Sequence, residues 1–326
     1  MKKNIFLYNI NGIKYFLYPK FLGKYAIKSK LSAISKLNDY ELEKISKRVN
    51  YYCCFIPTSV PKIPNLSNFE LLKKGSRYFF DTYEHMRFFP KHLLYTLEQG
   101  DINFELSTPS LCKSRPVLKD FSNNILLNMD KIRHFKFFTS LPLIKYESKK
   151  DILFFRGACY QNHRKDFMRK YFNHSICDLG HVGKEDEEEL KIWKKEKISI
   201  ENHMQYKFIL SLEGNDVATN LKWIMSSNSL AVMPEPKFET WFMEGRLIPN
   251  MHYIKIKSNY ENLQDRLEYY ISHPNESKEI IQNANSYIKQ FLDKKTENLI
   301  SFLVLRKYFY QTHQIEISSI EKQIFK

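Results

Sequence analysis

From about residue 150 onward, short apolar runs alternate along the chain with stretches of helical spacing. The apolar runs have the length of buried strands and occupy residues 152–155, 175–179, 208–212, 229–233 and 252–256. The helix-compatible stretches lie between or after them, at residues 163–171, 185–197, 200–206, 218–227, 263–271 and 276–291. Strands that alternate with helices in this way predict a parallel, doubly wound α/β domain.

The first half of the chain is less regular. Residues 1–20 are rich in β-branched and aromatic side chains around Asn11–Gly12, which predicts one or two short strands. Residues 24–50 and 67–98 carry helical spacing, and the three prolines between Pro57 and Pro64 predict a loop. The two runs that follow predict a buried strand and then a strand or short helix, at residues 125–129 and 132–138.

A domain junction is predicted where Pro142 is followed by a charged run at residues 147–151. We therefore expect an N-terminal domain at residues 1–148 and a second, α/β domain at residues 149–292. Residues 297–310 contain an apolar periodicity that predicts an amphipathic helix, and we expect the tail at residues 293–326 to return to the N-terminal domain.

The bulk composition narrows the class of partner. The net charge is 51 − 36 = +15, which favours an anionic partner such as a nucleic acid, a membrane surface, a nucleotide or a phosphorylated glycan. The five cysteines are odd in number and form no CxxC pair, so we expect free thiols in a reducing compartment rather than disulfides or a zinc ribbon. Polar residues interrupt the N-terminal apolar run, which excludes a membrane span there and predicts a cytoplasmic protein.

The first candidate site follows the strand at residues 152–155. Arg156 and Gly157 stand at its carboxyl end, and Arg164 follows in the next helix. Ligands of open α/β folds bind at this edge of the sheet, where arginine can pair with phosphate oxygens and glycine allows close approach.

The second candidate site surrounds the next strand of the domain. Lys207 opens this strand, and the polar loop Gly214–Asn215–Asp216 ends it. Three further polar side chains lie in the first turns of the helix that follows, where a phosphate can meet free backbone N–H groups: Thr219, Asn220 and Lys222. The alternative for Asp216 is a plain helix cap. Neither a Walker P-loop nor a GxGxxG motif is present.

The third candidate site is an acidic turn that contains a tryptophan. Glu239 and Glu244 have the spacing to bracket a ribose or hexose, and Trp241 can stack on a ring. The alternative is a core tryptophan between two solvated acids. The histidines form no HExxH or HxH pattern, so we expect no metal site.

Together these clusters resemble glycosyltransferase family 90. The sequence GNDVATNLKWIMSSNS followed by ETWFMEG is most similar to the lipopolysaccharide-modifying branch of that family. The matching stretches are LFFRG at Leu153–Gly157 with Arg164, Tyr206–Lys207, the block from Gly214 to Ser229, and the block from Trp241 to Tyr253. Upstream, KSRP at residues 113–116 and RHF at residues 133–135 are similar to the bacterial branch. The resemblance implies a GT-B architecture, in which two Rossmann-like domains face each other across a cleft, with the acceptor on the domain at residues 1–148 and the nucleotide sugar on the domain at residues 149–292. It also implies a metal-independent, inverting transfer from a UDP-sugar without any cofactor.

The chain departs from the family pattern at two places. The eukaryotic branch has a diphosphate-facing arginine where this chain has Asn220, so Lys222, Arg156 or the backbone must supply that contact. The Arg-Asp pair that provides the general base has no match here. Asp101, Asp120 and Asp130 are the candidates, and we rank Asp101 first because it precedes the KSRP motif.

These inferences predict a hexosyltransferase that moves glucose or galactose from a UDP-hexose to a lipopolysaccharide or lipooligosaccharide core acceptor. Its positive charge predicts a peripheral position on the anionic inner face of the cytoplasmic membrane, with no nucleic-acid partner. The alternatives are a basic nucleic-acid-binding protein and an inactive membrane-surface module of the same fold.

Overall fold

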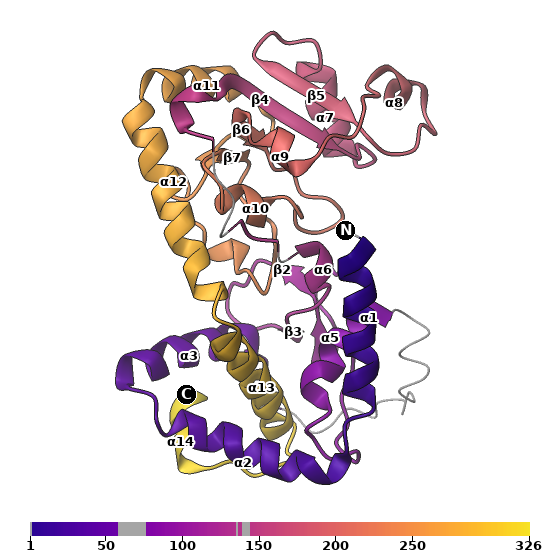
Figure 1. The fold of residues 1–326 in the computed structure, drawn as a ribbon, viewed down its shortest axis with the longest axis vertical. Helices are drawn as coiled ribbons and strands as arrows, with labels where there is room; N and C mark the ends of the chain where they lie inside the picture. Colours follow the sequence, from indigo (N-terminus) through magenta and orange to yellow (C-terminus); the bar gives the residue numbers. More distant parts are fainter. Residues whose placement is uncertain (1, 58–75, 135, 139–143) are drawn as a thin grey trace. The chain divides into compact units, whose positions relative to one another are not determined.

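Two units, each assembled from stretches that are distant in sequence, make up the computed structural model (Figure 1). The structure describes residues 2–57, 76–134, 136–138 and 144–326. Unit 1 comprises Met1–Arg133, Phe238–Met243 and Phe291–Lys326. Unit 2 comprises His134–Lys237 and Glu244–Gln290. The loop predicted between Pro57 and Pro64 lies almost entirely outside the described residues.

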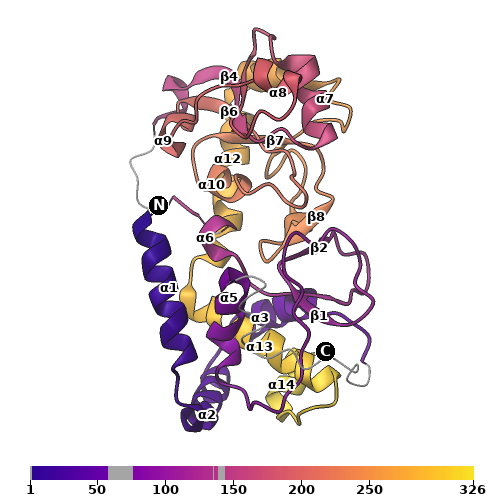
Figure 2. The ribbon, with the colours of Figure 1, turned by 90° about the vertical axis from the view of Figure 1, so that its right-hand side faces the viewer.

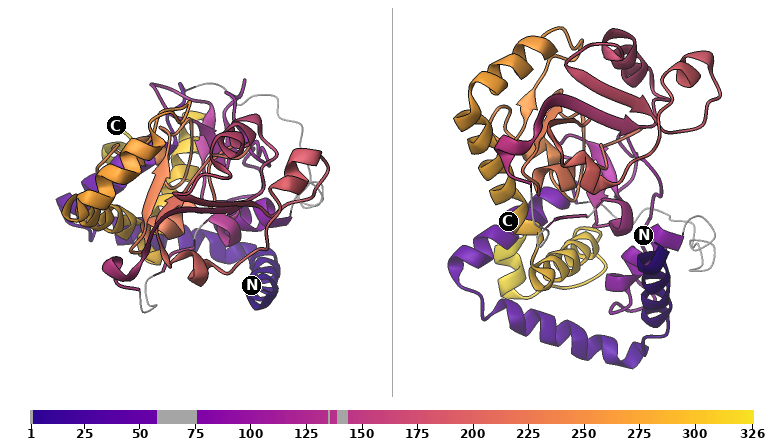
Figure 3. Two further views of the ribbon diagram at one scale, coloured as in Figure 1. Left: turned by 90° about the horizontal axis from the view of Figure 1, so that it is seen from above. Right: turned by 45° about the horizontal axis from the view of Figure 1, so that its top comes forward.

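Unit 2 is built on a five-stranded, wholly parallel sheet. In spatial order its strands are β5 (Cys177–His181), β4 (Lys150–Gly157), β6 (Tyr206–Leu210), β7 (Leu230–Met233) and β9 (Ile254–Lys255). Two of them, β4 and β5, lie side by side in the right-hand view of Figure 3. Along the chain β4 comes first, then β5 adds to one side of it and β6 to the other, so the strand order reverses between β4 and β6.

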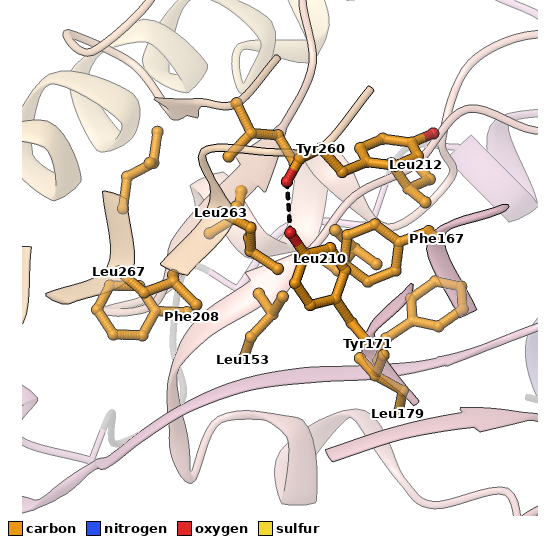
Figure 4. Packing of buried hydrophobic residues seen from close by; sticks show 14 of the residues in the cluster. Leu153, Phe167, Tyr171, Leu179, Phe208, Leu210, Leu212, Tyr260, Leu263 and Leu267 are labelled. Atoms are coloured by element: carbon orange, nitrogen blue, oxygen red, sulfur yellow. Dashed lines mark hydrogen bonds between the residues drawn. The ribbon is translucent and has the colours of Figure 1, made fainter. Parts of the chain in front are cut away.

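Helices cover both faces of this sheet. On one face, alternate strand residues such as Leu153 and Phe208 pack with α7 (Asn162–Tyr171), α11 (Leu263–Ser272) and α12 (Pro274–Ile288) (Figure 4). The opposite face is covered by two short helices, α9 (Ile200–His203) and α10 (Leu221–Met225), whose rings His203 and Trp223 lie edge to face. The parallel, Rossmann-like α/β fold predicted for this part of the chain is confirmed. Each fully buried leucine or phenylalanine stabilises it by about 1.5–3 kcal/mol.

Unit 1 is mainly helical. Its helices are α1 (Lys2–Phe16), η1 (Lys20–Leu22), α2 (Gly23–Ile34), α3 (Asp39–Tyr52), α5 (Ser76–Met86), α6 (Lys131–His134, shared with unit 2), α13 (Lys294–Gln311) and α14 (Ser319–Ile324). Its strands are β1 (Ser110–Cys112), β2 (Ser114–Pro116), β3 (Asn124–Leu126) and β8 (Phe238–Thr240), which pair as β1 with β3 and β2 with β8. Among the described residues, unit 1 holds these two strand pairs, and a parallel bridge joins Leu97 to Leu111 of β1. The second Rossmann-like domain that the resemblance implies stays a prediction.

The remaining elements are short. In unit 2 they are η2 (Tyr146–Ser148), α8 (Glu188–Ile192) and η3 (Glu244–Arg246), and in the stretch after α12 there is η4 (Lys289–Phe291). Residues 87–98 are irregular, so the long helix expected at residues 67–98 is limited in the described part of the chain to α5. All five cysteines are free thiols.

The N-terminal strands predicted at residues 1–20 are wrong, because this segment forms α1. Tyr8, Gly12 and Tyr15 recur at helical spacing and face α5. A Cβ atom on Gly12 would overlap the ring of Phe80, and the Tyr8 hydroxyl donates to the Arg77 carbonyl oxygen at 2.8 Å. Close helix packing therefore overrides the strand propensity of the β-branched and aromatic residues.

Helix α13 is not amphipathic, in contrast to the prediction. Residues 300–309 are all buried, and within unit 1 the helix packs against α3 and α5, with α14 also against α3 (Figure 2). Its charged side chains have partners inside the unit. Arg306 pairs with Glu321, and the Lys307 ammonium donates to the Asn50 side-chain oxygen at 2.6 Å. The helix is thus a core element of unit 1.

Candidate functional site

The reversal of strand order between β4 and β6 marks the candidate site. In doubly wound sheets, the loops that leave two such strands diverge and open a crevice at their carboxyl ends, where ligands bind. Here those loops are residues 158–161 after β4 and residues 211–220 after β6. The candidate residues Gly157 and Arg164 flank the first loop, and the candidates from Gly214 to Asn220 lie in the second.

Arg164 ties the two loops together from the first turn of α7. Its guanidinium donates to the carbonyl oxygen of Ala158 at 2.7 Å, and to those of Leu212 and Glu213 at 2.6 and 2.8 Å. The His163 Nε2 atom lies 2.8 Å from the same Glu213 oxygen, and burial lowers the pKa of this ring, which favours a neutral imidazole that donates there. The spacing of the loops is therefore set by side chains of α7.

The loop Gly214–Asn215–Asp216 lies at the carboxyl end of β6, and its middle residue is exposed. The Gly214 N–H donates to the Asp216 carbonyl oxygen at 2.9 Å, and the exposed Asn215 accepts a hydrogen bond from Gln161 at 3.0 Å. A Cβ on Gly214 would meet only the Arg164 guanidinium, at 3.6 Å, which is ordinary contact. The fold itself thus leaves room for a side chain here, while glycine leaves the backbone uncovered.

Asn220, which follows this loop, serves the fold. Asn220 accepts from the Ser211 hydroxyl at 3.0 Å and donates to the Leu210 carbonyl oxygen at 2.9 Å, which fixes it to the end of β6. Asp216 is buried, whereas Thr219 is exposed. The helix that follows, α10, starts only at Leu221 and is five residues long, so the long helix dipole expected at this loop is small.

Arg156 does not point out of the carboxyl edge. It lies on β4 opposite Gly180, but its guanidinium turns back along the strand to Asp178, at 2.8 Å, and lies 4.4 Å from the Phe154 ring. Burial alone would raise the pKa of Asp178, but the hydrogen bonds from Lys195 and Arg156 outweigh it and hold that pKa below its usual value. A diphosphate contact by Arg156 would require this ion pair to open.

The lysine expected at the start of β6 lies at the opposite edge of the sheet. Lys207 pairs with Asp151 at 2.6 Å, and Asp151 belongs to the first residues of β4. Both strands run in parallel away from this point, so the Lys207 ammonium lies at the amino edge and not beside the Gly214 loop. Ligands of doubly wound sheets bind at the carboxyl edge, so Lys207 does not lie with the candidate residues at the other end of β6.

Lys222 and Glu244 form an ion pair inside unit 2. Both side chains are almost completely buried, with exposed fractions of 0 and 2 %. The Lys222 charge is therefore held by Glu244, and a diphosphate could use it only at the expense of that pair.

Glu239 and Trp241, predicted to lie beside the nucleotide sugar, belong instead to the core of unit 1. The Glu239 carboxylate accepts from Arg115, the Tyr51 hydroxyl and the Leu118 N–H. Trp241 stacks on Tyr52 with ring centroids 3.9 Å apart, and its indole N–H donates to Glu297 at 2.5 Å. The alternative of a core tryptophan is thus correct for Trp241, although its acidic neighbour Glu239 is buried and not solvated.

With this geometry established, comparisons with known proteins define the family. The family model "Glycosyl transferase family 90" matches residues 137–314. An "O-glucosyltransferase LpsA" from Dichelobacter nodosus is 37 % identical over 271 residues, which cover 81 % of this chain and 82 % of the relative. The chain belongs to glycosyltransferase family 90.

More distant relatives of this family 90 member are eukaryotic. The "Protein O-glucosyltransferase 3" of Rattus norvegicus is 24 % identical across 49 % of this chain and 32 % of its own length. The "O-glucosyltransferase rumi homolog" of Aedes aegypti is 21 % identical across 50 % of this chain and 42 % of its own. The resemblance drawn from the sequence motifs is thereby confirmed, and the protein is a glycosyltransferase.

The acceptor side of this family 90 enzyme was expected in the N-terminal half, where three aspartates are candidate bases. Asp101 is partly exposed and pairs with Lys113 at 2.5 Å. Asp120 is exposed. Asp130 is buried between Arg77 and Arg133, has a left-handed backbone with φ of 51°, and has its pKa raised by burial in spite of the two arginines.

One carboxylate of unit 1 was missed by the sequence reasoning. Asp81 in α5 is buried and accepts from the Lys131 N–H at 3.1 Å, and burial raises its pKa to about 6. The only signal for it was an acid on the inward face of a helix, which periodicity alone does not separate from a surface acid. Within the described residues no helix is long and apolar enough to cross a membrane, and no cluster of three potential metal ligands is found.

Proposed function

We propose that this family 90 enzyme transfers a hexose, glucose or galactose, from a UDP-sugar to a lipopolysaccharide or lipooligosaccharide core acceptor. The proposed transfer inverts the anomeric centre, uses neither a metal ion nor a cofactor, and takes place at the cytoplasmic face of the inner membrane. Family membership supports the glycosyl transfer, and the name LpsA of the bacterial relative points to lipopolysaccharide. The GT-B arrangement that the motifs imply is part of this proposal.

The observation that carries the proposal is the pair of loops at the strand-order reversal. The uncovered backbone at Gly214 gives a diphosphate close access, and the Arg164 guanidinium lies directly behind it. Arg164 is half-buried, so solvent screens its charge at the loop only in part. Stabilisation of a leaving UDP requires fixed positive charge of this kind.

The decisive test is calorimetric titration with UDP, first with the intact protein and then with Gly214→Ala. Because the fold has room for this methyl group, the melting temperature should stay nearly unchanged. A diphosphate that lies against the backbone would meet the methyl group, so UDP affinity should fall at least about tenfold.

The matched control is Ser175→Thr, which also adds one methyl group but lies in the exposed segment before β5, at the amino edge of the sheet. UDP affinity should not change in this variant. Absence of UDP binding to the intact protein would refute the proposal. If Gly214→Ala and the intact protein bound UDP equally well, the diphosphate would not lie against this loop.

We propose Asp101 as the general base. The partial exposure of Asp101 allows an acceptor hydroxyl to reach it, and the Lys113 ammonium orients the Asp101 carboxylate. Asp130, in contrast, is buried between two arginines. Asp101→Asn should lower kcat by about 10²–10⁴-fold without changing UDP affinity. Asp120→Asn, an exposed acid on the same segment, should leave kcat unchanged. A kcat for Asp101→Asn close to that of the unaltered enzyme would assign the base to another carboxylate.

A further inference from the structure

The N-terminal helices have an outer surface that nothing in the donor site explains. Residues 1–38 contain eight lysines and no aspartate or glutamate, and the first acid of the chain is Asp39. This segment forms α1, η1 and α2 of unit 1. A run of cations without any acid is unusual even for a basic protein, since 36 acids are spread over the other residues.

Large apolar side chains are exposed on the same helices. The inner face of α1 is occupied by Tyr8, Gly12 and Tyr15, which pack on α5. On the other side and in the turn to α2, four apolar residues lie with more than half of their surface exposed: Ile13, Leu17, Phe21 and Tyr25. Phe21 and Tyr25 have exposed fractions of 73 and 72 %, so the fold does not use these rings.

Charge and apolar surface are interleaved at helical spacing. Ile13 and Leu17 are four residues apart at the end of α1, and Phe21 of η1 and Tyr25 of α2 are four residues apart across the start of α2. Exposed lysines neighbour them: Lys14, Lys24 and Lys28. We call these seven residues the α1–α2 patch. Lysines can extend their ammonium groups to phosphates while apolar neighbours enter the acyl boundary.

We propose that the α1–α2 patch docks the enzyme on an anionic lipid surface. Charge complementarity favours this partner, because residues 1–38 carry lysines and no acid that would repel a phosphate headgroup. The exposed rings add an apolar contact that nucleic-acid backbones do not require. The inference rests on the proposed function in one respect: the proposed lipopolysaccharide acceptor is anchored in a membrane, and the enzyme must reach it there.

The test is flotation of the full-length protein with phosphatidylcholine vesicles and with vesicles that also contain phosphatidylglycerol. The intact protein should bind only the anionic vesicles, and added salt should weaken binding. The variant Leu17→Ser/Phe21→Ser/Tyr25→Ser should lose at least about tenfold in partitioning. The variant Lys14→Gln/Lys24→Gln/Lys28→Gln should lose roughly a hundredfold at low salt, with a flatter salt dependence.

Matched controls carry the same number of changes on other exposed positions. Ile192→Ser/Ile248→Ser/Met251→Ser removes apolar surface from unit 2, and Lys119→Gln/Lys197→Gln/Lys289→Gln removes the same charge elsewhere. Both should bind vesicles as the intact protein does. Failure of the intact protein to bind anionic vesicles would overturn the proposal, as would equal losses in control and patch variants.

Two further results would assign the patch to another partner. Patch variants that keep vesicle binding but lose RNA binding would make it a nucleic-acid surface. Patch variants that keep vesicle binding but lose self-association would make it an interface between copies. UDP titration separates this inference from the proposed function, because patch variants should retain full UDP affinity, and a protein that binds vesicles but not UDP would refute only the function.

Discussion

Lys149 shows how a single buried cation can make the stability of unit 2 depend on pH. Its ammonium donates to two neutral acceptors, the Met204 carbonyl oxygen at 2.6 Å and the Ser229 hydroxyl at 2.9 Å. Burial lowers its pKa from the ordinary 10.5 to about 8. The folded state therefore prefers the neutral amine, and the unfolded chain binds the proton more tightly.

The free energy of unfolding should consequently rise as the pH increases from about 8 to about 10.5, by about 2–3 kcal/mol from this residue. Below pH 8 the lysine is charged in both states and its contribution is constant. In Lys149→Met this rise should disappear, which urea denaturation at a series of pH values would measure. Lys197→Met, at an exposed lysine, should keep the rise. The same slope in both variants would contradict the assignment.

At the scale of elements, β8 is held in unit 1 by a buried ion pair with its partner strand. Arg115 of β2 and Glu239 of β8 are opposite each other in the antiparallel register, and both side chains are fully buried. Arg115 also donates to the Tyr51 carbonyl oxygen at 2.8 Å, so the pair links the strands to α3. Removal of one partner leaves the other charge buried and uncompensated. The resulting loss in the free energy of unfolding is larger than the net contribution of the intact pair.

Arg115→Met should therefore destabilise unit 1 by about 3–5 kcal/mol in chemical denaturation. The affinity of the protein for UDP should be unchanged under native conditions, because Glu239 belongs to the core and not to the donor site. Arg169→Met, which removes an exposed arginine that also has acidic partners, should have little effect on stability. A loss of UDP affinity in Arg115→Met without a loss of stability would restore Glu239 to the nucleotide-sugar site.

The same strand shows where prediction from sequence stops. The β-strands of unit 2 were predictable because parallel strands buried on both faces are continuous apolar runs, and Arg164 and Gly214 follow from them as residues of one sheet edge. Nothing in the residues 238–243 shows that the chain leaves unit 2 there, so Glu239 and Trp241 were placed beside the ligand. Arg156 was located correctly on its strand, but the direction of its side chain depends on Asp178 of the neighbouring strand.

At the scale of the whole molecule, the C-terminal segment completes unit 1. The apolar residues of α13 are almost all buried, and each contributes about 1.5–3 kcal/mol. Their sum exceeds the net stability of an ordinary domain, which is about 5–15 kcal/mol. Loss of this helix should therefore unfold unit 1 and not merely shorten it.

Deletion of residues 294–326 should remove the hydrogen-exchange protection of α3 and α5. The amides of β4 and β6 should remain protected, because the core of unit 2 draws on none of the deleted residues. Unit 2 serves as the internal control in the same sample. Retained protection of α3 and α5 after the deletion would show that α13 is dispensable for unit 1.

The return of α13 to unit 1 also has a consequence for biosynthesis. During translation the first 133 residues leave the ribosome before any part of unit 2. Their core remains incomplete until α13 has also emerged. Unit 2 is complete once Gln290 is outside the exit tunnel. We therefore expect unit 2 to fold first, and the N-terminal helices to fold only after residues 294–326 have been synthesised. This order is the reverse of the usual one, in which the N-terminal domain folds first during synthesis.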